Sequence, residues 1–342
     1  MVNKLVALLG SAAVILAVVW VGRMDKVEEG LTDFRAMAKA INEDQKSTWR
    51  ADPEAKIPSP EELKRMFNLI IEKKKPENFD EAPEISLDSD ELPANFHPRE
   101  KWGFCSTFDS IRDQSSCGSC WAVAAASAMT DRRCIATAGA ESSPLSAEDL
   151  LECCLNCGYG CNGGFLYQSW SYAKSSGLVS GDKHGDSRFC MPYMFPQCNH
   201  HGSGPFEDCD KHHYVTPPCT RACHPEFKTR SYVEDKVKLK KSYPLEGAQR
   251  MMREIYTNGP VEASFTVYED FLLYKSGIYV HSKGKEVGSH AVKILGWGEE
   301  NGVKFWLVAN SWNENWGEKG FFRIFRGNDH CDIESDVAAG IF

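Results

Sequence analysis

Apolar residues recur with helical spacing in the first part of the chain. One helical face would be formed by Leu31, Phe34, Ala38 and Ile41. A second helix is predicted after Ser59, a capping residue followed by a proline at the first helical position. Its apolar face would be formed by Leu63, Met66, Phe67 and Ile70. The pattern predicts a small helical module within residues 23–91.

The rest of the chain changes from helical to strand patterns. An alanine-rich helix is predicted over residues 121–134, and another, capped by Ser146, includes residues 150–154. Apolar and polar residues then alternate over residues 261–267, as in a half-buried strand. Asn301-Gly302 separates two further apolar runs and predicts a hairpin. A helical half followed by a β half indicates an α+β fold.

Composition excludes several classes of protein. The 342 residues are 42% hydrophobic and carry a net charge of −9, which is typical of a folded globular chain and not of a disordered one. An acidic chain is unsuited to tracking phosphates, and its only unbroken basic triplet, Lys73-Lys74-Lys75, is expected to be a solvated face, so nucleic acid is not expected as a partner.

Cysteine is abundant and unevenly placed. Of the 14 cysteines, none precedes Cys105 and only Cys331 follows Cys223. This density indicates a disulfide framework formed in an oxidising compartment. The apolar run 5–21 after Lys4 agrees, because it predicts a signal peptide over residues 1–22. An uncleaved membrane anchor is the alternative, and secretion or delivery to a lysosome or endosome is expected.

The segment 114–122, QSSCGSCWA, carries the sharpest chemical signal. It places Cys120 where a glycine-containing turn enters the alanine-rich helix. Backbone N–H groups and the helix dipole at such a position favour thiolate over thiol. Cys120 is therefore a candidate nucleophile.

A proton carrier and a group to orient it are found in the predicted hairpin. His290 lies at the start of its first strand and Asn310 near the end of its second. A two-residue turn at Asn301-Gly302 would place Asn310 opposite Lys293, about 10 Å along the strand from His290. A bulge or strand twist could bring the two side chains together. The amide oxygen of Asn310 could then orient the imidazole, with Trp312 shielding the bond from water.

Together these motifs resemble the papain-type cysteine peptidases. The signature covers CGSCW at 117–121, HA at 290–291 and NSW at 310–312. His290 and Asn310 lie further along the chain from Cys120 than is usual in the family, so an insertion is expected between Cys120 and His290. Residues 198–224 account for it, since their clustered Cys and His, with the pair His200-His201, resemble the occluding loop of cathepsin B-like members. The run 305–312 is especially similar to helminth members.

The resemblance implies a papain-like two-lobed fold, with a helical lobe, a β-rich lobe and the active-site cleft between them. It implies a signal peptide at 1–22, a propeptide at 23–91 and a peptidase domain at 92–342. It also implies a zymogen whose mature form is an endopeptidase and dipeptidyl-carboxypeptidase. No cofactor or metal is implied. The expected partners are protein and peptide substrates, the chain's own propeptide as inhibitor and cystatin-like inhibitors, with a monomeric mature form.

Residue roles follow from the same resemblance. Cys120 would be the nucleophile, His290 the general base and acid, and Asn310 its orienting partner, while Gln114 would help to form the oxyanion hole. His200 and His201 would receive the substrate's terminal carboxylate. The remaining substrate contacts would come from Gly118, Gly163, Gly164, Phe165, Leu166, Ala291, Trp312 and Asp336. The implied disulfides are Cys105–Cys134, Cys117–Cys161, Cys153–Cys219, Cys154–Cys157, Cys190–Cys223 and Cys198–Cys209.

Two positions depart from the cathepsin B pattern. Asp336 stands where the family has a longer glutamate at the floor of the second subsite, so arginine should be accepted there only weakly. The occluding loop of relatives is held by two ion pairs, of which this sequence keeps only His200 with Asp113; at the second, Asn315 replaces the aspartate. The loop is therefore expected to open readily.

Three other interpretations remain open at this point. Cys117 and Cys120 could form a redox-active disulfide. The Cys/His-rich span 190–224 could bind zinc as part of an interaction module. The chain could also be an inactive peptidase homologue with a binding role.

Overall fold

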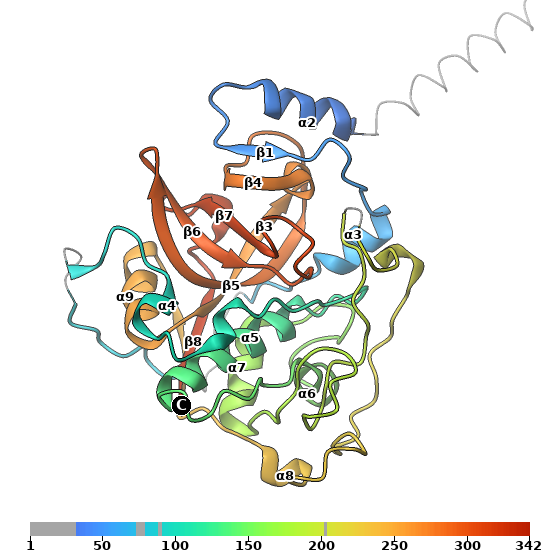
Figure 1. The fold of residues 1–342 in the computed structure, drawn as a ribbon, viewed down its shortest axis with the longest axis vertical. Helices are drawn as coiled ribbons and strands as arrows, with labels where there is room; N and C mark the ends of the chain where they lie inside the picture. The colour runs from blue at the N-terminus through green and yellow to red at the C-terminus, as the bar shows by residue number, and fades with distance from the viewer. Residues whose placement is uncertain (1–31, 73–78, 88–90, 202–203) are drawn as a thin grey trace, which may run out of the picture.

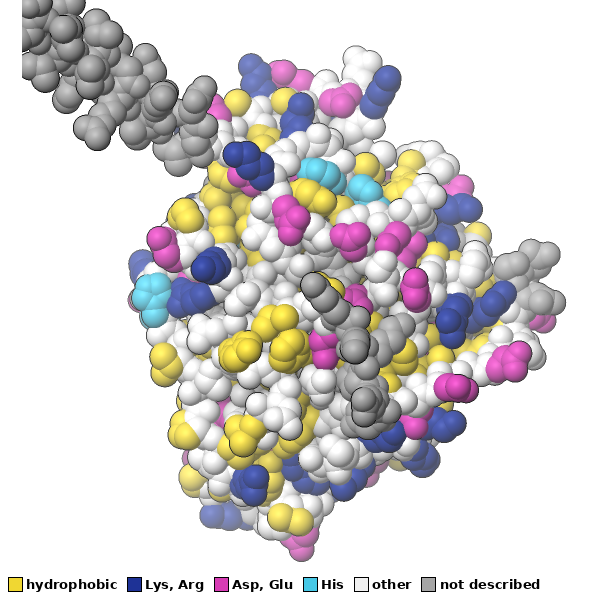
Figure 2. Space-filling model, turned by 180° about the vertical axis from the view of Figure 1, so that it is seen from behind, with side chains coloured by type: hydrophobic (Ala, Val, Ile, Leu, Met, Phe, Trp, Pro, Cys, Tyr) yellow, Lys and Arg dark blue, Asp and Glu magenta, His cyan; other side chains and the backbone are white. Residues whose placement is uncertain are grey.

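The computed structural model describes residues 32–72, 79–87, 91–201 and 204–342. The predicted signal peptide and Leu31 lie outside the described residues. Within the described ranges, no helix has the length and apolar character needed to cross a membrane. On the face shown in Figure 2, Lys and Arg side chains lie among Asp and Glu side chains, in keeping with the mixed charge of the sequence.

The fold has a β part and a helical part that meet along one long helix (Figure 1). Eight strands form one sheet in the order β1-β4-β7-β6-β5-β3-β8-β2. Their bounds are β1 Trp49–Ala51, β2 Lys241–Leu245, β3 Val261–Tyr268, β4 Tyr274–Tyr279, β5 Glu286–Glu300, β6 Val303–Ala309, β7 Phe321–Phe325 and β8 Val337–Ile341. The α-helices are α2 Phe34–Glu43, α3 Pro60–Met66, α4 Pro98–Lys101, α5 Cys120–Ala136, α6 Ala147–Cys153, α7 Leu166–Ser175, α8 Tyr232–Asp235 and α9 Ala248–Asn258. Short 3₁₀ helices are η3 Ser106–Asp109, η4 Cys209–Lys211, η5 Glu269–Leu273 and η6 His330–Asp332.

Helix α5 is central because its sequence is buried on nearly every side. Its small alanines let α6 and α7 pack on one side and β5 and β3 on the other. The first three turns, which are almost entirely apolar, need such cover. The start of α5 therefore lies at the junction of the two parts.

The described residues before Leu92 lie against the rest of the protein (Figure 1). We call the described residues 32–72 and 79–87 the N-terminal segment. Its strand β1 pairs antiparallel with β4 and extends the sheet. Trp49 is buried there, and its indole donates to the Val280 carbonyl oxygen at 3.1 Å. Figure 1 shows α2 and β1 at the sheet edge beside β4, and α3 further along toward α5.

One sequence prediction about this segment is wrong. The apolar face expected to continue to Ile70 ends with α3 at Met66. Phe67 ends the helix as its C-cap and still donates to the Leu63 carbonyl oxygen, whereas the N–H groups of Leu69 and Ile70 donate to the carbonyl oxygens of Ser289 and Gly164. Tertiary hydrogen bonds thus replace the helical ones at Leu69 and Ile70.

Candidate active site

Cys120 is the first residue of α5, as the sequence predicted, and its side chain is fully buried. The N–H groups at the start of a helix have no intrahelical partner and can stabilise a thiolate. Those of Cys120 and Trp121, together with that of Ala291 on β5, act on the sulfur in this way. The residue before the helix, Ser119, bonds through its hydroxyl to that of Tyr193 at 2.7 Å. Tyr193 also donates to the Gln114 carbonyl oxygen at 2.8 Å, which fixes the turn.

The hairpin brings His290 and Asn310 together. His290 Nε2 lies 2.9 Å from Asn310 Oδ1, which leaves Nδ1 without a hydrogen-bond partner among the described residues. The Trp312 ring stacks on the imidazole with centroids 5.3 Å apart and covers the bond from solvent. This geometry fixes the ring and keeps Nδ1 available to exchange a proton.

Gln114 lies close to Cys117, in the turn that leads into α5. Its side-chain amide donates to the Cys117 carbonyl oxygen at 3.0 Å, and its Oε1 accepts from the Ser311 hydroxyl at 2.6 Å. Ser311 is a positioning residue that the sequence reasoning missed, although it directly follows Asn310. The Gln114 amide is thus held near Cys120 with one further N–H to donate.

Burial shapes the protonation of the pair. It raises the pKa of Cys120 to about 12, although the three nearby N–H groups act in the opposite direction. It also lowers the pKa of His290 to about 4, against the effect of the bond to Asn310. Both groups are therefore neutral near pH 7, as thiol and imidazole. A covered site of this kind lacks the thiolate that attacks a carbonyl.

The cover is the N-terminal segment, which runs through the cleft as a peptide would. The N–H of Ser289 donates to the Phe67 carbonyl oxygen at 3.0 Å, and the N–H of Ile70 donates to Gly164 at 2.9 Å. The Phe67 ring meets His290 edge-on at 5.6 Å. Close approach is possible because the positions opposite lack a Cβ. One added at Gly118 would run into the carbonyl of Arg65, and one at Gly163 into that of Asn68.

Leu69 occupies the apolar part of the cleft. It is buried in one cluster with Cys120, Leu166 and Ala291. Asp336 lies at the edge of this region and accepts a hydrogen bond from the Tyr167 hydroxyl at 2.6 Å. Phe165 caps α7 at its N-terminus, so the same helix start presents Leu166 and Tyr167. Two of the predicted second-subsite residues, Leu166 and Ala291, thus share a buried cluster with an apolar side chain of the N-terminal segment.

The loop closed by the Cys198–Cys209 disulfide, residues 198–209, is held at Asp113. His200 Nε2 lies 2.7 Å from Asp113 Oδ1, with both side chains buried. The Asn313 amide donates to Asp113 Oδ2 at 2.9 Å and to the Cys198 carbonyl oxygen at 2.8 Å. The sequence reasoning missed Asn313. Its contacts make the attachment stronger than the single ion pair that was expected.

His201 lies next to this attachment, in a different environment. Its ring packs edge-on against Trp312 at 4.7 Å, and neither ring nitrogen has a hydrogen-bond partner among the described residues. Burial is the main reason that its pKa is lowered to about 3. In this covered form the imidazole is neutral.

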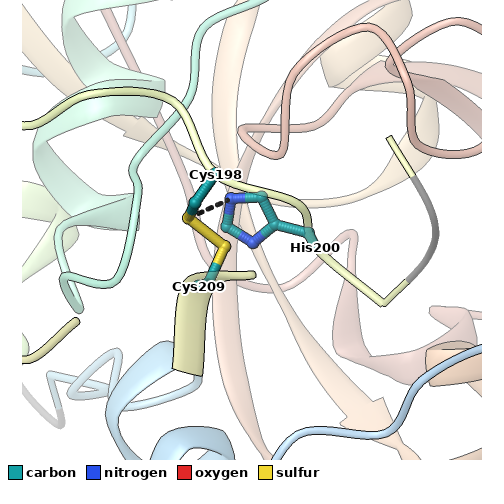
Figure 3. A group of neighbouring side chains, drawn as sticks. All are labelled: Cys198, His200 and Cys209. Atoms are coloured by element: carbon teal, nitrogen blue, oxygen red, sulfur yellow. Dashed lines mark hydrogen bonds between the residues drawn. A yellow bond between two sulfur atoms is a disulfide. The ribbon is translucent and has the colours of Figure 1, made fainter. Parts of the chain in front are cut away.

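The cysteines settle two of the alternative interpretations. Cys117 is bonded to Cys161 and not to Cys120, so the two do not form a redox pair. Cys198, His200 and Cys209 lie close enough together to suggest a metal site, but Figure 3 shows the two sulfurs joined in a disulfide. Disulfide sulfurs are not thiolate ligands, so this group does not form a zinc site.

All the cysteines of span 190–224 are paired in the same way. The structure contains the disulfides Cys105–Cys134, Cys117–Cys161, Cys153–Cys219, Cys154–Cys157, Cys190–Cys223 and Cys198–Cys209. Cys120 and Cys331 are free. These are the pairs and the free cysteines that the family resemblance implies.

Comparison with known proteins agrees with this geometry. Residues 92–341 match the papain family cysteine protease domain. A cathepsin B-like cysteine proteinase of Schistosoma japonicum is 50% identical over 73% of each chain, and cathepsin B-like cysteine proteinase 4 of Caenorhabditis elegans is 42% identical over 92% of each. Among solved structures, procathepsin B S9 of Trypanosoma congolense has a TM-score of 0.77 and 34% identity, covering 91% of this chain and 98% of its own. The chain therefore belongs to the papain family of cysteine proteases, in its cathepsin B-like group.

Proposed function

We propose that Cys120, His290, Asn310 and Gln114 form the catalytic site of this protease. The bond between His290 Nε2 and Asn310 Oδ1, with Nδ1 left free, is the observation that carries the proposal. Once the cleft is open, Nδ1 takes the Cys120 proton and the thiolate attacks the carbonyl carbon of the substrate. His290 then returns the proton to the leaving amine, and water hydrolyses the acyl-enzyme.

The tetrahedral intermediate needs donors for its oxyanion. The side-chain amide of Gln114 and the backbone N–H of Cys120 are suited to this role, since Ser311 and the Cys117 carbonyl hold the amide in place. Asn310 is a positioning residue, because it touches the imidazole and not the substrate.

We further propose that the chain is made as a zymogen in which residues 23–91 are the propeptide, removed by cleavage shortly before Leu92. The contacts of Phe67, Leu69 and Ile70 in the cleft support this role. So does the neutral state of Cys120 and His290 beneath them. Six disulfides fit passage through the secretory pathway to the exterior, a lysosome or an endosome.

The 198–209 loop suggests a second activity. It places His200 and His201 against Trp312, beside His290. An imidazolium there could bind the terminal carboxylate of a peptide, which would give dipeptidyl-carboxypeptidase activity in addition to endopeptidase activity. Inhibition by cystatin-like proteins and a monomeric mature form belong to the same proposal.

Active-site labelling tests the catalytic assignment. Acid-activated enzyme is treated with a thiol-directed peptidyl epoxide, and the modified residue is mapped by mass spectrometry. Label should be found on Cys120. Cys120→Ala should lose both label and peptide hydrolysis, whereas the matched variant Cys331→Ser, at the other free cysteine, should keep both. Turnover that survives in Cys120→Ala would overturn the assignment.

A further inference from the structure

Helix α7 begins without a capping side chain of its own. Its N-cap residue is Phe165, whose side chain has no hydrogen-bond acceptor, and its first turn contains no acidic residue. The first N–H groups of a helix have no intrahelical partner, and the helix dipole makes them attract negative charge. The start of this ten-residue helix therefore has donors to offer to a group from elsewhere.

A carboxylate of the N-terminal segment occupies these donors. Glu72 Oε2 accepts from the backbone N–H of Tyr167 at 3.2 Å, and Glu72 Oε1 accepts from the side-chain amide of Gln168 at 2.9 Å. The backbone N–H of Gln168 acts on the same carboxylate. Two N–H groups of the helix start and one side-chain amide thus converge on both oxygens of a single carboxylate, as in anion sites at helix starts.

This contact lies next to the second subsite. Leu69, three residues before Glu72, shares a buried cluster with Leu166, the first residue of α7. An extended chain advances about 3.3 Å per residue, so three residues span at most about 10 Å. When the second residue of a substrate before the cut takes the place of Leu69, its third or fourth residue can therefore reach the helix start.

The groups around Glu72 show how a carboxylate is recognised there. Burial raises the pKa of Glu72, and the nearby carboxyl of Asp336 acts in the same direction. The Gln168 amide and the N–H groups of Tyr167 and Gln168 act in the opposite direction. The groups that favour the charged form are hydrogen-bond donors and not cations, so recognition depends on the direction of these N–H groups.

We propose that in the mature enzyme the start of α7 is a carboxylate-binding subsite, which selects substrates with glutamate or aspartate at the third or fourth residue before the scissile bond. The proposal rests on the proposed protease function. Removal of the N-terminal segment takes Glu72 away and leaves the N–H groups of Tyr167 and Gln168 to a substrate. Gln168 is then a specificity-determining residue, because it alone among these donors contributes a side chain.

Paired peptide substrates test this subsite. Each pair has leucine at the second residue before the cut and differs only in glutamate or its uncharged isostere glutamine at the third or the fourth. At about pH 6 the glutamate is ionised in solution. Mature enzyme should cleave the glutamate member of at least one pair with kcat/KM about threefold to tenfold higher, mainly through a lower KM.

A matched pair of glutamine variants locates the effect. Gln168→Leu should bring the ratio of kcat/KM for glutamate over glutamine to about one. Gln249→Leu, at an exposed glutamine of α9, should leave the ratio unchanged. A wild-type ratio of one at both positions, or the wild-type ratio in Gln168→Leu, would overturn the proposal.

Failure of the proposed protease function is distinguishable, because neither member of any pair would then be cleaved. Thermal melting of the full chain carrying Cys120→Ala decides the subsite in that case. Glu72→Gln and Gln168→Leu should each lower the melting temperature, and together they should lower it by less than the sum of the two. Additive losses would show that Gln168 does not hold the carboxylate, which would also overturn the proposal.

Discussion

The backbone N–H of Lys56 donates to the carbonyl oxygen of His201 at 2.9 Å. This bond joins the N-terminal segment to the 198–209 loop. Lys56 also reaches the loop through its ammonium, which lies 3.2 Å from Asp208 Oδ2. The imidazole of His201 is buried nearby without hydrogen-bond partners. Covering the cleft and burying a neutral histidine are therefore linked events.

This link predicts how acid releases the N-terminal segment. The pKa of His201 is lowered from 6.5 to about 3 by burial. A lowered histidine pKa leaves the covered form at full stability above pH 6.5 and weakens it as the pH falls toward 3. Between pH 6.5 and 4.5 the loss would be up to about 3 kcal/mol. His201→Phe keeps the ring volume without titrating, so its melting temperature should fall less with acid.

The measurement is thermal melting from about pH 7.5 to about 4.5 of the Cys120→Ala chain with and without His201→Phe. The control is His213→Phe, which changes an exposed histidine in the span 190–224. An equal acid-induced drop with and without His201 would contradict the prediction. Asp80, also in the N-terminal segment, is a weaker acid sensor. The hydrogen bond from Lys174 lowers its pKa, so this contact is lost only below the ordinary value of 3.8.

The pair Glu148 and Glu152 predicts the opposite pH dependence. Burial raises the pKa of Glu148 from 4.5 to about 8. A raised carboxyl pKa gives stability that is fully present below pH 4.5 and is lost as the pH rises through 8. The unfolding free energy of the Cys120→Ala chain should therefore fall between pH 4.5 and 8 because of this pair. Urea denaturation should show that Glu148→Gln reduces the loss, while exposed Glu226→Gln does not. A loss of the same size in Glu148→Gln would contradict this.

Removal of the Trp49 anchor should activate the zymogen early. Trp49 is 3% exposed and packs on Tyr279 with ring centroids 5.2 Å apart. Truncating such a residue costs about 3–5 kcal/mol, which the covered form loses and the mature form does not. Trp49→Ala proenzyme should hydrolyse a peptide substrate at neutral pH. Its exposed neighbour on β1 gives the control Arg50→Ala, which should stay latent; equal latency of both would refute the role of the anchor.

Attachment of the 198–209 loop should depend on Asn313 as well as on His200. Asn313 donates to both Asp113 and the Cys198 carbonyl oxygen, so its removal takes a donor from the Cys198 carbonyl and leaves Asp113 Oδ2 with the Cys198 N–H alone. In mature enzyme, Asn313→Ala and His200→Ala should both raise the ratio of endopeptidase to dipeptidyl-carboxypeptidase activity. Two substrates, one blocked and one free at the carboxyl end, measure the ratio. His213→Ala should leave it unchanged, and an unchanged ratio in Asn313→Ala would show that its bonds do not hold the loop.

The hairpin shows how far the sequence could predict the site. Asn301-Gly302 forms the turn, and the two residues have φ of 53° and 79°, which suit Asn and Gly. The predicted register placed Asn310 opposite Lys293, but Lys293 faces Ala309. Leu295 is an extra residue between the pairs made by Ile294 and Gly296. A bulge within a continuous apolar run leaves no trace in the pattern of residues.

Asn313 and Tyr193 illustrate what no pattern could predict. Each acts through bonds to chain segments far away in sequence, at Asp113 and at Ser119. Neither lies in a periodic run, because its role depends on where loops meet. By contrast, the Cys120 position could be inferred, since helix starts and alanine-rich helices have local sequence signals.

The bond between Tyr167 and Asp336 predicts substrate preference at the second subsite. The hydroxyl donates to Asp336 Oδ1 at 2.6 Å and so occupies an oxygen that a substrate arginine would need. Mature enzyme should therefore prefer apolar side chains there, in line with Leu69 in the same region. Tyr167→Phe removes the donor and leaves the carboxylate charge. The ratio kcat/KM for arginine at this position should rise about threefold to tenfold, with little change for leucine. Asp336→Ala added to Tyr167→Phe should abolish the gain. If kcat/KM for arginine rises as much in the double variant, the increase comes from the space left by the hydroxyl and not from the freed carboxylate.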